Sequence, residues 1–147
     1  MRGWLAGCGL GAMLLAGSGL VGCKEDPPKP HVDYDPATVE FYHQDVEPIF
    51  RSKCFRCHGG MNRKGQFSMQ TRTGMMRGGK HGVVIVPGDP AASLLVRLIR
   101  HEPARTGIAP EPGPMPDKRK KISDADIAVV ERWVKAGAIM PPDGSKP

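Results

Sequence analysis

Two cysteines and a histidine stand close together in the segment Cys54-Phe55-Arg56-Cys57-His58. One helical turn between the two thiols gives the spacing at which both can form thioether bonds to the vinyl groups along one edge of a porphyrin. The histidine behind the second cysteine can then bind the iron from one side of the ring. The pattern predicts one covalently attached haem c, held by Cys54 and Cys57, with His58 as the proximal iron ligand.

Two other kinds of site use a C-x-x-C pair. A zinc site needs four ligands and usually a second Cys or His pair at similar spacing, but the remaining cysteines are Cys8 and Cys23 near the N-terminus. A thioredoxin-like dithiol is expected at the start of a helix inside a βαβ pattern, and no such pattern surrounds this motif. Haem attachment is therefore the favoured interpretation.

The ligand on the opposite face of the iron decides what such a haem can do. We expect Met115, because prolines flank it and the proline after it favours an extended backbone, which leaves little entropy to lose on binding. Met61 follows His58 too closely to reach the far face, and Met140 lies beyond the last predicted helix.

Other donors remain as alternatives to Met115. Methionines 69, 75 and 76 fall in a glycine-rich segment, where methionine fills apolar gaps along a haem edge. His81 or His101 would instead give a haem with two histidine ligands, and an open position would leave the iron free to bind a small molecule.

The N-terminus has the pattern of an export signal. Residues 3–22 carry no charge and follow the single cation Arg2. They end in Leu-Val-Gly before Cys23, which is similar to the bacterial lipoprotein signal, whereas no apolar run precedes Cys8. An uncleaved membrane span is the alternative, but seven glycines disfavour it. We expect a signal peptide over residues 1–22 and a lipid on Cys23 that holds the protein outside the cytoplasm, on the periplasmic face or at the outer membrane.

The rest of the chain has room for one small domain. A charged, proline-rich tether over residues 23–38 precedes a haem domain over residues 39–142, and residues 143–147 form a tail. Aromatic residues make up only 5% of the chain, so a buried haem would supply apolar volume that the side chains lack.

Three helices are predicted within this domain. Asp45 is the expected N-cap of the first, whose apolar face leads to the cysteines, and Asp89 is the expected N-cap of the second, which runs towards Arg100. Residues 59–88 and the five-proline segment 101–116 are expected to be irregular. Ser123 caps the last helix, which ends at Gly137. Its predicted buried stripe is Ile127, Val130, Trp133 and Val134, with Trp133 packed near Phe50.

The order of these features resembles a class I cytochrome c. More narrowly, the segments Asp45–Phe50, Gly78-Gly79, Val86–Pro90, Ser93–Leu95 and Glu131–Val134 are similar to the planctomycete-type cytochrome c family, over about residues 39–140. The resemblance implies an all-α domain of about three helices with long irregular loops around the haem bound at Cys54, Cys57 and His58. It places Met115 in a Met-Pro-Pro ligand loop, although Asp117 stands here in place of the second proline.

These features favour a membrane-tethered electron carrier over an enzyme, since we find no catalytic constellation elsewhere. A haem enzyme or a gas or redox sensor with a labile or open sixth position is the alternative, and a binding module with a structural haem is a further one. The net charge is +6, and its densest cluster is the basic segment 118–121, Lys-Arg-Lys-Lys. This cluster is either a solvated loop or a docking patch for an acidic redox protein. No nucleic-acid-binding signature accompanies it.

Overall fold

The structure is a computed structural model that describes residues 32–145. The predicted signal peptide, Cys23 and most of the predicted tether lie outside these residues. Within the described part of the chain, no helix combines the length and the apolar character that crossing a membrane requires.

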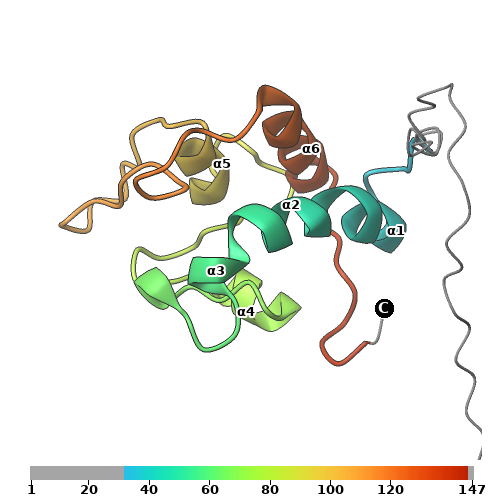
Figure 1. Cartoon of the computed structure of the whole chain (residues 1–147), viewed down its shortest axis with the longest axis horizontal. Helices are drawn as coiled ribbons and strands as arrows, with labels where there is room; N and C mark the ends of the chain where they lie inside the picture. Colours follow the sequence, from blue (N-terminus) through green and yellow to red (C-terminus); the bar gives the residue numbers. More distant parts are fainter. Residues whose placement is uncertain (1–31, 146–147) are drawn as a thin grey trace, which may run out of the picture. The chain divides into compact units, whose positions relative to one another are not determined.

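All regular elements among residues 32–145 are helical. In chain order they are α1 (Val39–Phe41), the π-helical turn η1 (Tyr42–Val46), α2 (Glu47–Lys53), α3 (Phe55–His58), the 3-10 turn η2 (Lys64–Gln66), α4 (Arg72–Arg77), α5 (Leu94–Ile99) and α6 (Asp124–Lys135). Figure 1 shows α2 between the pair α5 and α6 on one side and the segment with α3 and α4 on the other. The all-α prediction is confirmed, although the helices are shorter and more numerous than the three expected.

The first helical run begins earlier than the sequence suggested. Thr38 is its N-cap, since the Thr38 hydroxyl accepts a hydrogen bond from the Phe41 N–H over 3.2 Å. Asp45 lies inside η1, within the helical run, so its predicted role as the N-cap of the first helix is wrong. The helix extends towards the N-terminus because Phe41 is fully buried and lies under the Arg132 guanidinium of α6, 5.1 Å from its ring centre.

The middle of the chain is less irregular than predicted, because α4 forms within it. The Thr71 hydroxyl accepts from the Gly74 N–H over 3.0 Å and caps this helix, while Met75 turns into the core. The helix α5 starts at Leu94 rather than directly after Asp89. The Asp89 carboxylate instead caps the preceding turn, through a 2.9 Å bond from the Ala92 N–H. Residues 101–116 contain no helix or strand, as expected.

The helix α6 follows the prediction closely. The Ser123 hydroxyl accepts from the Asp126 N–H over 3.0 Å, and Gly137, at a φ of 105°, follows the end of the helix. The buried residues of α6 are the four of the predicted stripe, Ile127, Val130, Trp133 and Val134.

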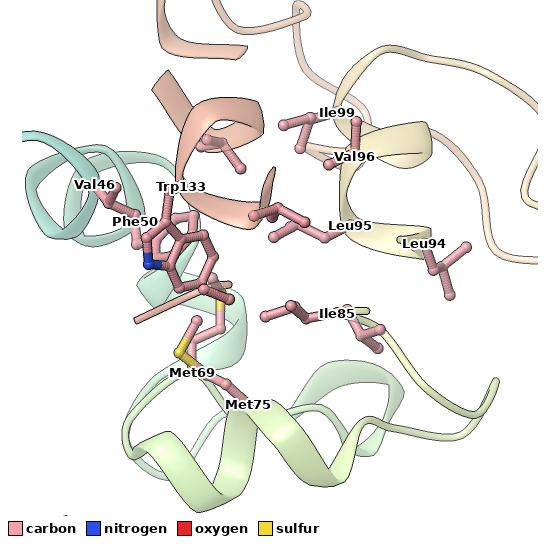
Figure 2. Packing of buried hydrophobic residues seen from close by; sticks show 14 of the residues in the cluster. Val46, Phe50, Met69, Met75, Ile85, Leu94, Leu95, Val96, Ile99 and Trp133 are labelled. Carbon is pink, nitrogen blue, oxygen red and sulfur yellow. The ribbon is translucent and has the colours of Figure 1, made fainter. Parts of the chain in front are cut away.

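Trp133 is the centre of the core that α6 shares with the first helical run (Figure 2). Its ring centre lies 5.6 Å from that of Phe50, as expected, and 5.9 Å from that of Tyr42. The indole Nε1 donates to the carbonyl of Ile139 over 2.8 Å, so its polar atom is satisfied. This packing fixes the direction of α2, and with it the point at which the chain enters the Cys54–His58 segment.

Candidate cofactor site

The cysteine and histidine side chains are carried on a helical turn that continues from α2. The Cys54 N–H donates to the Phe50 carbonyl over 2.8 Å, and both the Cys57 and the His58 N–H donate to the Cys54 carbonyl over 3.0 Å. Both thiols are free and half-buried. The turn therefore presents Cys54, Cys57 and His58 as one rigid group.

This group lines a cavity of about 330 Å³. Met115 lines the same cavity, so the four predicted haem-binding residues come together although 57 positions separate His58 from Met115. Other apolar groups in its walls are Met69, Ile99, Pro112 and Ile122. A second cavity of about 80 Å³ also has His58, His81 and Met115 in its walls. The volume and the apolar lining are those of a cofactor site.

His58 lies in surroundings that keep its imidazole neutral. Burial lowers its pKa, and the nearby backbone groups of Phe67 and Lys64, which raise the pKa, only partly offset this. The Nδ1 atom is buried and makes no hydrogen bond of normal geometry. Because only an acceptor stabilises a protonated ring, the two backbone groups that raise the pKa are carbonyls near the imidazole. A neutral ring with its proton on Nδ1 has a lone pair on Nε2 for a metal.

The Cys54 thiol is unlike that of a redox dithiol. Burial raises the pKa of Cys54 to about 11, and the neighbouring Cys57 adds to the increase. Catalytic dithiols have a lowered thiol pKa, so Cys54 lacks their defining property. For a zinc site, residues 32–145 offer no group of three or more His, Cys, Asp or Glu side chains that could hold a metal ion.

Met115 is positioned through its backbone. Its N–H donates to the carbonyl of Leu98 at the end of α5, over 2.9 Å, and its side chain packs against the core. Of the alternative donors, Met61 is fully exposed, while Met75 and Met140 are buried in the core. His101 is exposed and is not part of either cavity wall. His81 and Met69 do line the larger cavity.

The sequence predicted only some of the basic side chains that line the cavity. Within the 118–121 cluster Arg119 alone lines it, and Lys121 instead pairs with Asp124 over 2.8 Å. Lys53, Arg56 and Lys64 line it as well. Lys53 and Arg56 lie next to the cysteines in the sequence, so their place beside the cavity could have been predicted. Lys64 lines the cavity because of the loop after α3, which the sequence does not predict.

Residues 54–106 match the family described as Planctomycete cytochrome C. Over this part of the chain, the sequence is similar to the planctomycete cytochrome c family. No curated protein and no solved structure matches the chain. The matched segment of the cytochrome begins at Cys54, includes α3, α4 and α5, and ends before Met115.

The residues of the cavity fit the haem c that the family implies. Two free thiols and a neutral imidazole lie on one helical turn, the opposing loop contributes a thioether, and the remaining wall is largely apolar. Backbone acceptors lie near the His58 ring, and a metal-binding histidine usually donates its other ring N–H to such a group.

Proposed function

We propose that this cytochrome is a membrane-tethered electron carrier with one haem c, attached through Cys54 and Cys57. His58 and Met115 are its axial ligands in this proposal. The observation that carries it is the presence of both side chains in the walls of one cavity, although they come from opposite ends of the domain sequence.

A bound haem would supply a one-electron couple, and the chain would control its availability. With His58 and Met115 both engaged, no coordination position is left for a substrate, and thioether ligation favours a raised reduction potential. The bond from the Met115 N–H to the Leu98 carbonyl limits the movement of the methionine loop. These features favour an electron carrier over an enzyme.

The charges around the cavity favour an acidic redox partner. Lys53, Arg56, Lys64 and Arg119 line it, against the single carboxylate of Asp117. A positive rim steers a negatively charged surface towards the cofactor edge and raises the rate of association. The lipidation of Cys23, predicted from the sequence, would keep this encounter on a membrane surface outside the cytoplasm.

Replacement of the proposed sixth ligand tests the function. Purified Met115→Ala should lose the weak red absorption band that marks methionine bound to ferric haem, and its reduced form should bind carbon monoxide. The matched control is Met61→Ala, because Met61 is fully exposed and should leave the spectrum unchanged. An unaltered spectrum in Met115→Ala would show that another group binds the iron. Rapid carbon monoxide binding by the unmodified protein would instead favour a haem enzyme or sensor.

A further inference from the structure

His81 occupies a tightly held turn beside the cofactor cavity. Gly79 and Gly82 exchange two backbone hydrogen bonds, each 3.0 Å long, and the Lys80 N–H donates to the Gly65 carbonyl over 2.7 Å. Gly82 has a φ of 88°, which closes the turn at a value that other residues rarely adopt. The backbone of His81 is therefore fixed against the loop that follows His58.

The side chain of His81 lies in the walls of the cofactor cavities, near enough to the exposed Glu111 carboxylate for the two charges to interact. It lines both cavities together with His58 and Met115. Its Nδ1 atom is buried and has no hydrogen-bond partner. The edge of the ring away from Nδ1, which carries Nε2, is the edge left to face the cavities.

The burial of Nδ1 decides where the proton of a neutral His81 ring sits. A proton on Nδ1 would be a buried donor without an acceptor, which is unfavourable, so the proton belongs on Nε2. Binding iron through Nε2 requires the opposite arrangement. His58 has backbone carbonyls near its ring, whereas the acceptor recorded near His81 is the exposed Glu111 carboxylate, which makes no hydrogen bond with the buried His81 Nδ1. His81 is thus a donor at the cavity wall rather than an iron ligand.

A haem in this cavity brings two anionic acceptors, its propionate carboxylates. We propose that the Nε2–H of His81 donates a hydrogen bond to one haem propionate. This inference rests on the proposed haem attachment but not on Met115 as a ligand. Lys64 and Lys80, which line the smaller cavity with His81, add positive charge that favours a carboxylate there.

Resonance Raman spectra of the full-length, haem-loaded protein test the proposal through the propionate bending vibration, which responds to hydrogen bonds at the carboxylate. His81→Phe removes the donor and should shift this vibration. It should also lower the reduction potential, because the negative charge left on the propionate stabilises ferric iron. His81→Gln keeps an N–H donor and should restore part of both properties. His101→Asn is the control, since His101 is exposed outside the cavity and has a positive φ that asparagine tolerates.

The outcomes separate this proposal from the proposed function. The methionine–iron band should persist in His81→Phe, and its loss would overturn the proposal, because it would show that His81 acts on the iron ligation rather than on the propionate. An unchanged propionate vibration in His81→Phe would overturn the proposal as well. If His81→Phe does not accumulate with haem, His81→Asn, whose shorter side chain withdraws the donor, should show the same shift, and the absence of that shift would equally overturn the proposal. A missing methionine–iron band in the unmodified protein would refute the Met115 assignment while the propionate vibration still tests His81.

Discussion

Removal of the Ser93 hydroxyl should lower the stability of the domain and loosen α5, which borders the cofactor cavity. The Ser93 side chain is fully buried before α5. The hydroxyl accepts from the Val86 N–H over 2.8 Å and donates to the Asp89 carbonyl over 2.8 Å. Ser93→Ala leaves the Val86 N–H without an acceptor, whereas the Asp89 carbonyl keeps the Ser93 N–H at 3.2 Å.

The expected cost follows from that single lost acceptor. A buried polar group left without a partner costs about 1–3 kcal/mol. Serine and alanine differ little in volume, so no cavity term adds to it. The free energy of unfolding of the haem-loaded protein should therefore fall by roughly 1–3 kcal/mol, seen as a lower urea midpoint with an unchanged slope when helicity is followed by circular dichroism.

A second serine provides the control. The Ser52 hydroxyl of α2 is exposed and only donates to the Ile49 carbonyl over 3.1 Å, so Ser52→Ala should change stability by less than about 0.5 kcal/mol. Equal losses in the two variants would refute the reasoning, because they would show that burial and the Val86 bond do not set the cost.

Two further perturbations test the elements around the site. Glu47 is partly buried, which raises its pKa, but hydrogen bonds from His43 and Arg51 outweigh this and hold the pKa below 4.5. Because the folded-state pKa is depressed, the Glu47 contribution is complete above about pH 4.5 and is lost as the pH falls through the lower folded value. Glu47→Gln should therefore show a smaller loss of stability on acidification than the unmodified protein, and parallel curves of urea midpoint against pH would contradict this. A Cβ atom at Gly79 would lie 2.6 Å from the Gly65 carbonyl oxygen, whereas one at Gly113 would meet nothing within 4 Å. Gly79→Ala should lower the free energy of unfolding by about 1–3 kcal/mol and Gly113→Ala by less than about 0.5, and similar urea midpoints would show that the Gly79–Gly82 turn shifts freely.

Local signals explain which elements could be predicted from the sequence. The helix α6 has an N-cap serine, a regular buried stripe and a terminal glycine, and all three act within a few residues of each other. The start of the first helical run was misplaced because Asp45 and Thr38 are both good capping residues. The choice between them depends on the packing of Phe41 under Arg132, which lies far away in the sequence.

Some residues of the site could also be predicted from local sequence patterns, and others could not. The thiols and His58 were predictable because the attachment chemistry fixes their spacing. Met115 was expected from the prolines that flank it and from the ligand loop of the family, but its place in the same cavity as His58 depends on tertiary packing. The role of His81 could not be read from the sequence, since it depends on which ring nitrogen is buried and on the acceptors near it.

The position of Met115 depends in part on Ser93, which lines neither cavity. At the end of α5 the Leu98 carbonyl accepts hydrogen bonds from outside the helix, from the His101 N–H over 3.1 Å and from the Met115 N–H over 2.9 Å. Five of the six residues of α5 are buried in the core, and the hydrogen bonds of Ser93 fix where the helix starts. The proposed sixth ligand is therefore held by a connected path from a buried serine through one short helix. A defect at Ser93 should weaken methionine ligation before the domain unfolds, since the helix can shift while the core around Trp133 stays packed.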